Sequence, residues 1–363
     1  MRILVTGVDG YIGAILGPKL VQKGFDVVGI DCGFYRDGWL YNDPRPRPLT
    51  FTKDVRHITA ADVRGFDAVV HLAELSNDPL GELHERTTFA INHLGSVSLA
   101  RACKEAGVSR FIYTSSCSVY GAAEDGGERD EQSVPNPQTA YAKCKVLVES
   151  DVGALADTRF SPVFLRNATA FGASPRMRFD IVLNNLAGFA WTTGEIKMTS
   201  DGTPWRPLVH VDDICQAIIL ALEAPREAVH NEIFNVGDDL QNYRIREIAS
   251  IVGQVFQDCP VTFGKPSADN RSYRTSFAKI RRHLPEFRCR WSAELGALQL
   301  HQVFSHINMT KELFRFRGFT RLEQLKHLIA TGQIDAEFYW RPLEEKVEQA
   351  GAEVDSAIRV TGA

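Results

Sequence analysis

The sequence of 363 residues lacks the features that mark several large classes of protein. Its net charge of −4 leaves no basic excess of the kind that nucleic-acid-binding proteins carry. No apolar run reaches the length that a membrane-spanning helix needs. The first expected strand starts at residue 2, which leaves no room for a signal peptide. We therefore expect a cytoplasmic protein that binds neither nucleic acid nor a membrane.

The seven cysteines form neither a disulfide framework nor a zinc motif, because they are scattered, odd in number and never spaced C-x-x-C. Isolated thiols of this kind are typical of a reducing compartment. With 44% hydrophobic and 24% charged residues, the composition is that of an ordinary globular protein, and the chain is long enough to bury a large core. The sequence shows no internal repeats.

The N-terminal segment has the pattern of a dinucleotide-binding unit. An apolar strand is expected over 2–6, a helix over 11–23 and a second strand over 26–30, which ends at Asp31. The turn between the first strand and the helix holds three glycines: Gly7, Gly10 and Gly13. Such glycines let the backbone approach a pyrophosphate, and the acid can accept ribose hydroxyls. The alternative is a βαβ unit without a ligand, but the order of strand, helix and acid favours the dinucleotide site.

Strands and helices alternate through the first half of the chain. Apolar runs predict further strands over 68–72, 111–114 and 163–165. Helical spacing predicts helices over 88–106 and 139–155, and three prolines within 41–50 predict a surface loop. This alternation predicts an α/β fold, a Rossmann-type doubly wound parallel sheet, in which ligands bind beyond the carboxyl ends of the strands.

The alternation weakens in the second half, which suggests a division into two units. A dinucleotide-binding domain is expected over 1–170, to which 206–238 returns as a helix and a strand. Segments 171–205 and 239–341 would form a smaller, discontinuous C-terminal lobe that binds the substrate. The charged tail over 342–363 is expected to fray.

A tyrosine and a lysine lie four residues apart in the helix expected over 139–155. Residues at i and i+4 share one face of a helix, so Lys145 would stand beside Tyr141. A nearby cation favours the phenolate and lowers a phenol pKa that is normally about 10. The pair can therefore move a proton on and off a substrate hydroxyl near neutral pH.

Further motifs follow these in an order that is specific as a set. They are Asp54-Val55-Arg56, His71-Leu72-Ala73, Asn92, Ser115-Ser116-Cys117-Ser118-Val119-Tyr120-Gly121, Arg206 to Asp213, and Arg271. With the glycine turn and the Tyr141-x-x-x-Lys145 pair, they resemble the extended short-chain dehydrogenase/reductases. The resemblance is to the NAD-dependent nucleotide-sugar epimerase/dehydratase branch, which includes the UDP-glucose 4-epimerase-like enzymes. It runs from residue 1 to about 340.

The resemblance implies a set of sites with no metal. The implied catalytic residues are Ser116, Tyr141 and Lys145. The implied NAD-binding residues are Gly7, Gly10, Tyr11, Ile12, Gly13, Asp31, Asp54, Val55, Leu72, Ala73, Asn92, Ser115, Tyr141 and Lys145. The implied substrate-binding residues are Glu74, Ser116, Ser118, Asn167, Arg206 and Arg271. For Asn92, a hydrogen bond to backbone near the active-site strand is an alternative to ligand contact.

Each role follows from the resemblance. Tyr141 would be the catalytic acid and base, Lys145 would hold the nicotinamide ribose, and Ser116 would hydrogen-bond the reacting sugar oxygen. Arg206 and Arg271 would grip the diphosphate of a nucleotide-diphosphate sugar, because a guanidinium bonds phosphate oxygens in pairs. Without the resemblance, the serines also fit a tight loop, and both arginines fit the surface.

Glu74 departs from the family pattern, because relatives usually place a small residue at this position. Two interpretations remain open. The carboxylate would lie near the nicotinamide and the sugar, where it could bind a hydroxyl or act as an extra acid and base, for example in 3- or 5-epimerisation of a keto-sugar. Alternatively, it would point into solvent.

The implied reaction is epimerisation of a nucleotide-sugar, expected at C4, through a transient keto-sugar. The family's dehydratases carry an acidic pair where this chain has Cys117 and Ser118, so dehydration is disfavoured. A nucleotide-keto-sugar reductase and a nucleotide-uronic acid decarboxylase remain as alternatives, as does a cofactor-binding regulatory protein with a dead site. Many relatives dimerise through helices that match 92–106 and 139–155, so we expect a homodimer.

Overall fold

A parallel sheet of seven strands, in the order β11-β7-β5-β4-β1-β2-β3, forms the centre of the molecule. A computed structural model describes residues 1–76, 84–122, 127–266 and 271–342, so the expected tail over 342–363 lies outside the described residues apart from its first residue. The strands of the central sheet are β1 (Arg2–Thr6), β2 (Asp26–Asp31), β3 (Leu49–Thr52), β4 (Ala68–His71), β5 (Arg110–Ser116), β7 (Ser161–Asn167) and β11 (Glu232–Val236). Both β4 and β7 are buried along their whole length, as is expected of strands covered on both faces.

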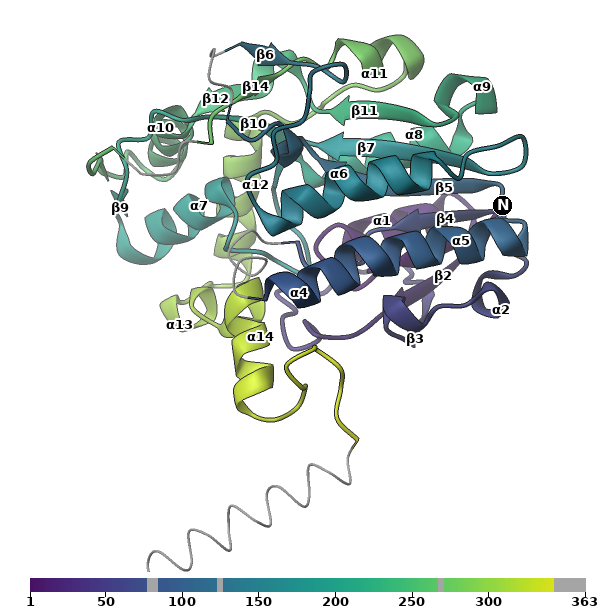
Figure 1. Ribbon diagram of the computed structural model, residues 1–363. Coiled ribbons are helices and arrows are strands. Elements are labelled where there is room, and N and C mark those ends of the chain that lie inside the picture. The colour runs from purple at the N-terminus through teal and green to yellow at the C-terminus, as the bar shows by residue number, and fades with distance from the viewer. Residues whose placement is uncertain (77–83, 123–126, 267–270, 343–363) are drawn as a thin grey trace, which may run out of the picture.

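Helices cover both faces of this sheet (Figure 1). On one face lie α2 (Ala60–Val63), the π-helix η2 (Phe89–Gly95), α5 (Ser96–Ala106) and α6 (Ala140–Gly153). On the other face lie α1 (Gly13–Gln22) and α8 (Val211–Glu223). Alternate residues of β1 enter different cores: Ile3 and Val5 pack with α1 and α8, whereas Leu4 packs with α5. The doubly wound α/β fold expected from the alternation is confirmed.

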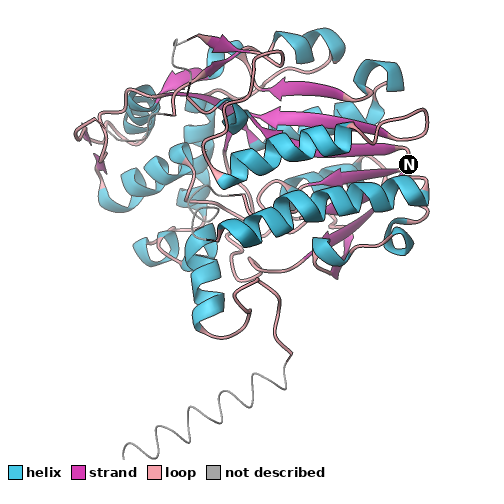
Figure 2. Cartoon of the chain, viewed as in Figure 1, coloured by secondary structure: helices cyan, strands magenta, loops and turns pink. Residues whose placement is uncertain are grey.

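A smaller set of elements lies beyond the carboxyl ends of the central strands (Figures 1 and 2). In its three-stranded sheet, β10 (Trp205–His210) lies between β8 (Thr169–Phe171) and β12 (Asn242–Arg244). Two further pairs are β9 (Ile196–Lys197) with β13 (Val261–Thr262) and β6 (Glu128–Arg129) with β14 (Arg274–Thr275). Its longer helices are α7 (Val182–Thr193), α10 (Ile245–Val255), α12 (Ala293–His306) and α14 (Arg321–Ala330). Helices α7, α10 and α12 pack against one another.

Short helical turns complete the described chain. They are α4 (Glu85–Thr88), α9 (Arg226–Val229), α11 (Ala278–His283), α13 (Lys311–Phe314), η1 (Val55–His57), η3 (Cys117–Tyr120), η4 (Asp239–Gln241) and η5 (Arg317–Phe319). Among the described residues, no helix combines the length and the apolar character needed to cross a membrane.

Two details differ from the sequence expectation. The proline-rich segment over 41–50 is not entirely a loop, because β3 begins at Leu49 and pairs with β2 at the edge of the sheet. The side chains of β3 are mostly exposed, so its sequence lacks the apolar pattern from which a strand is predicted. Within the returning segment over 206–238, β11 joins the central sheet beside β7, whereas β10 joins the small sheet with β8 and β12.

Candidate active site

A cavity of about 660 Å³ lies at the carboxyl ends of the central strands, within the usual size range of ligand sites. Its lining contains each residue expected to bind cofactor or substrate except Asn92. Asn92 is instead fully buried in the π-helix η2, where its side-chain amide bonds the backbone N–H and carbonyl of Leu75, at 2.8 and 3.0 Å. Its structural role is therefore to fix the segment after β4.

The glycine turn between β1 and α1 forms one wall of the cavity. Gly7 has a φ of +71°, and a Cβ placed on it would lie 2.7 Å from the backbone nitrogen of Ala73. A Cβ on Gly13 would lie 2.3 Å from the carbonyl oxygen of Gly7. Both contacts are too short for any larger residue, so only glycine allows this close approach of strand and helix. The result is a shallow backbone cradle of the kind that receives a pyrophosphate.

Asp31 lies at the end of β2, on the same wall of the cavity. Its carboxylate accepts hydrogen bonds from the backbone N–H groups of Gly33 and Asp9, at 2.7 and 3.1 Å. Burial raises the pKa of Asp31, and the Gly33 hydrogen bond opposes that rise. The carboxylate is thus fixed in the position where the adenosine ribose of a dinucleotide would meet it. The cradle and this acid fit NAD.

Tyr141 and Lys145 stand together on α6, as their spacing predicts. The Lys145 ammonium lies 5.2 Å from the centre of the Tyr141 ring and 4.6 Å from that of Tyr113. It also donates to the carbonyl oxygen of Thr114 and forms an ion pair with Glu74. These contacts hold the ammonium against β5, beside the phenol that is expected to transfer the proton.

Glu74 does not point into solvent. Its side chain is 4% exposed, and its carboxylate is bonded by the Lys145 ammonium and by the Tyr113 hydroxyl. Burial disfavours the charged form of Lys145, but the combined attraction of Glu74, Tyr141 and Glu149 outweighs it and raises the pKa of the ammonium. Burial likewise raises the pKa of the Glu74 carboxyl, while Lys145 and Tyr113 favour its charged form. An anion is thus built into the site beside the cation that assists Tyr141.

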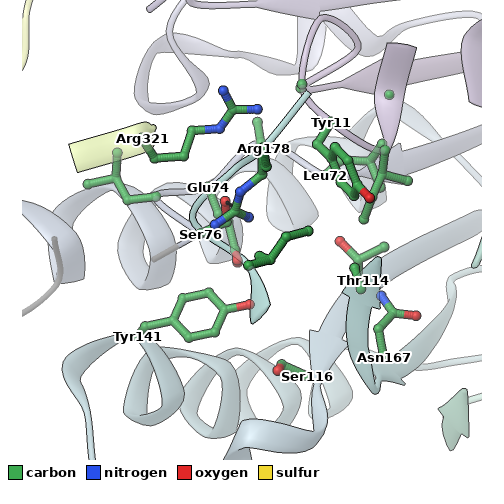
Figure 3. A pocket seen from close by; sticks show the side chains of 18 of the residues that line it. Tyr11, Leu72, Glu74, Ser76, Thr114, Ser116, Tyr141, Asn167, Arg178 and Arg321 are labelled. Carbon is green, nitrogen blue, oxygen red and sulfur yellow. Dashed lines mark hydrogen bonds between the residues drawn. The ribbon is translucent and has the colours of Figure 1, made fainter. Parts of the chain in front are cut away.

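Three buried polar atoms in the cavity lining have no hydrogen-bond partner among the described residues: Tyr35 Oη, Ser118 Oγ and Asn167 Oδ1. Buried polar atoms are rarely left unsatisfied, so all three atoms are suited to a polar ligand. The neighbouring Ser116 Oγ accepts from the backbone N–H of Ser118 at 3.1 Å, and Figure 3 shows Ser116, Asn167 and Tyr141 around the same space. Ser115, in contrast, donates to Glu149 at 2.5 Å.

Cys117 is fully buried, and its thiol donates to the carbonyl oxygen of Arg166 at 3.1 Å. Burial raises the pKa of this thiol, so it is a packed side chain and not an acid or a nucleophile. The described residues contain no cluster of three or more potential metal ligands.

Arg206 and Arg271 meet at another part of the cavity. The Arg206 guanidinium donates to the backbone carbonyl oxygens of Arg271 and of Trp205, and lies 5.8 Å from the centre of the Tyr273 ring. Strand β10 therefore brings together two arginines that are far apart in the sequence.

Two further arginines line the cavity, Arg178 and Arg321, and neither was expected from the sequence. Arg178 follows β8, and Arg321 is the first residue of α14. Neither belongs to a recognisable motif, and only the folded chain places them in the cavity (Figure 3).

The fold and the site define a class of enzyme: a dinucleotide-binding α/β protein with a tyrosine and lysine pair at the carboxyl end of its sheet. Residues 3–237 match the model of the NAD dependent epimerase/dehydratase family, and the chain belongs to this family. This match and the similar sequences confirm the prediction of an NAD-dependent enzyme of the nucleotide-sugar epimerase type.

Proteins that are similar in sequence or fold include nucleotide-sugar epimerases and a dehydratase. The chain is 27% identical over 277 residues to the UDP-glucose 4-epimerase of Neisseria gonorrhoeae, covering 68% of this chain and 80% of that protein. In fold it is similar to the dTDP-glucose 4,6-dehydratase of Streptomyces venezuelae solved with NAD, with a TM-score of 0.75, 24% identity, and coverage of 86% and 100% of the two chains. The UDP-glucose 4-epimerase of Thermotoga maritima, solved with UDP-glucose, gives a TM-score of 0.73, 21% identity, and coverage of 85% and 100%.

Proposed function

We propose that this protein interconverts two nucleotide-diphosphate sugars that differ in configuration at C4. The observation that carries the proposal is that Tyr141, Lys145 and Ser116 line the same cavity as the glycine turn and Asp31, with the Lys145 ammonium 5.2 Å from the centre of the Tyr141 ring. Curated relatives that are UDP-glucose 4-epimerases support the same reaction.

Each residue has a chemical task in this reaction. Tyr141 removes the proton from the C4 hydroxyl and later returns it, while Ser116 holds the same oxygen by a hydrogen bond. NAD, when bound, supplies the hydride acceptor and donor. Lys145 stabilises the phenolate, and Arg206 and Arg271 hold the substrate diphosphate. The keto-sugar must present its other face to the cofactor before the hydride returns.

The two residues after Ser116 also support epimerisation over dehydration. The position directly after Ser116 is the buried thiol Cys117, and the next is Ser118, whose hydroxyl is a very weak acid. Neither side chain can protonate a leaving hydroxyl efficiently near neutral pH.

The test is to incubate purified protein with single nucleotide-sugars, without added cofactor, and to follow the products by proton NMR. An interconverted pair of C4 stereoisomers supports the proposal, and Tyr141→Phe is the control that should form neither. If product forms only with stoichiometric consumption of NADH or NADPH, the protein is a nucleotide-keto-sugar reductase and not an epimerase. Release of carbon dioxide from a nucleotide-uronic acid would identify a decarboxylase. Tight binding without any turnover would favour a regulatory protein.

We also propose that the enzyme is a homodimer joined through η2, α5 and α6. Figure 1 shows α5 and α6 side by side on one face of the sheet, and two leucines there are unusually exposed, Leu94 at 61% and Leu147 at 38%. Burial of this face would create a four-helix interface. Light scattering of the eluted protein should give twice the chain mass, and the Leu94→Glu variant should shift it toward the monomer.

The cellular setting is proposed from composition and chemistry. All seven cysteines are free thiols, which supports a reducing, cytoplasmic location. The proposed reaction would supply a sugar donor for carbohydrate biosynthesis. Fractionation of the source cells tests the location: recovery of the protein in an extracellular or membrane fraction would contradict it.

A further inference from the structure

Arg178 and Arg321, here called the arginine pair, form a positively charged part of the cavity lining that the reaction at Tyr141 does not use. Arg178 donates from Nε to Asp180 at 2.8 Å and from Nη1 to Ser76 at 3.1 Å. Arg321 is 2% exposed, and its guanidinium stacks 4.0 Å from the centre of the Tyr35 ring. Across the described ranges, no hydrogen bond or ion pair joins the Arg321 guanidinium to another group.

The charges around the arginine pair do not balance. The Asp180 carboxylate binds the Arg178 guanidinium and accepts the backbone N–H of Arg321 at 3.2 Å. Arg176 adds a third cation nearby, but its guanidinium donates to the backbone carbonyls of Tyr35 and Arg36. Burial, and then repulsion from Arg178, lowers the pKa of Arg321 to about 10, so the side chain stays charged at neutral pH. Among the described residues, the Asp180 carboxylate attracts both guanidinium groups but pairs directly only with Arg178. Two buried cations that share one carboxylate are costly, which points to an anionic ligand.

The arginine pair stands between the two expected ribose positions. Arg321 rests on Tyr35, which follows Asp31 and so marks the adenosine side of the cavity. Arg178 is bonded to Ser76, close to Glu74 and Tyr141 on the nicotinamide side. Figure 3 shows Arg178 and Arg321 near each other, with Tyr11 of the glycine turn on the opposite side of the view. Between its two riboses, a dinucleotide carries its diphosphate.

We propose that the arginine pair binds the diphosphate of NAD from the side opposite the glycine turn. The glycine turn offers backbone N–H groups, and the arginine pair adds two charged forks that can bond phosphate oxygens in pairs. The diphosphate would then be enclosed on both sides. This enclosure would keep NAD bound through repeated cycles, as an enzyme that regenerates its cofactor in place requires.

The test measures binding, not activity, on full-length protein stripped of cofactor. Isothermal titration would compare NAD, ADP-ribose, adenosine and UDP on the wild type, Arg178→Gln and Arg321→Gln. Each variant should weaken NAD and ADP-ribose binding by about ten- to hundred-fold and leave adenosine, which has no phosphate, unchanged. UDP affinity should also be unchanged. Arg271→Gln is the matched control, because it lines the same cavity and should weaken UDP alone.

Several outcomes would overturn the proposal. If the variants bind ADP-ribose like the wild type, the arginine pair does not hold the cofactor diphosphate. If UDP or a nucleotide-uronic acid loses affinity while ADP-ribose does not, the anion belongs to the substrate. Arg321→Lys keeps the cation and should restore most of the affinity that Arg321→Gln loses. If either glutamine variant unfolds, the salt dependence of wild-type binding provides the test. The affinity for ADP-ribose must fall more steeply with rising salt concentration than the affinity for adenosine, because only the diphosphate would contact the two cations. Equal slopes refute the proposal.

Discussion

Glu74 should raise the pKa at which Tyr141 loses its proton, and Glu74→Gln should therefore lower it. The Glu74 carboxylate forms a buried ion pair with Lys145, whose ammonium lies 5.2 Å from the centre of the Tyr141 ring. The amide of Gln removes the negative charge and nearly preserves the shape. Lys145 then acts on the phenol as an uncompensated cation, which favours the phenolate.

The size of the shift follows from these distances. With an effective dielectric constant of about 20, an ammonium at the observed 5.2 Å stabilises a phenolate by about 3 kcal/mol. The Glu74 carboxylate, paired with that ammonium, cancels part of this stabilisation. Its removal should therefore lower the pKa of the phenol by a part of this free energy, where one pKa unit corresponds to about 1.4 kcal/mol.

The assay is the pH dependence of kcat/KM for the wild type and Glu74→Gln. Tyr141 must lose its proton to act as the base, so its pKa sets the acidic limb of this profile, and that limb should move to lower pH in the variant. Tyr113→Phe is the matched control: it removes the hydroxyl that donates to Glu74 but leaves both charges, so its profile should move much less. An unchanged profile for Glu74→Gln would refute the coupling. A shift to higher pH would show that Lys145 loses its proton together with its partner, contrary to the reasoning.

Four further predictions follow from the site and the core. Tyr141→Phe should keep NAD affinity but lose turnover by ~10²–10⁴-fold, and near-normal turnover would remove it from the mechanism. Asp31 should select NAD over NADP by repelling a 2′-phosphate, so equal affinities in titration would contradict its role. Arg206→Ala and Arg271→Ala should each weaken UDP binding by about ten- to hundred-fold in the same assay, and unchanged affinity in both would exclude this site. Burial, with a further contribution from Lys145, lowers the pKa of His71 to about 3, so its stabilisation is complete above pH about 6.5 and is lost as the pH falls. Denaturant unfolding should show about 2 kcal/mol less stability from this group at pH 5 than at pH 7.5, and His71→Gln should remove that part of the pH dependence; identical slopes would contradict it.

Local features of the sequence were enough to predict the cofactor side of the site. The glycine turn, the acid after the second strand and the spacing of Tyr141 and Lys145 each depend on residues close together in the chain, and backbone geometry fixes what they do. The alternation of strands and helices likewise predicted the doubly wound sheet. The strand β3 was missed because an exposed edge strand has no apolar face to reveal it.

Contacts between distant segments were decided only by the tertiary structure. Glu74 and Lys145 are 71 residues apart, and no periodicity relates them; they pair because β4 ends, and α6 begins, at the same edge of the sheet. Arg178 lies in a loop and Arg321 begins a helix, and these two segments, distant in the sequence, both line the cavity. Charges beyond one turn of helix or strand interact through space, so their balance depends on packing that no local pattern encodes. The sequence by itself determined the dinucleotide-binding turn and the spacing of Tyr141 and Lys145, and the folded chain determined the charges that surround them.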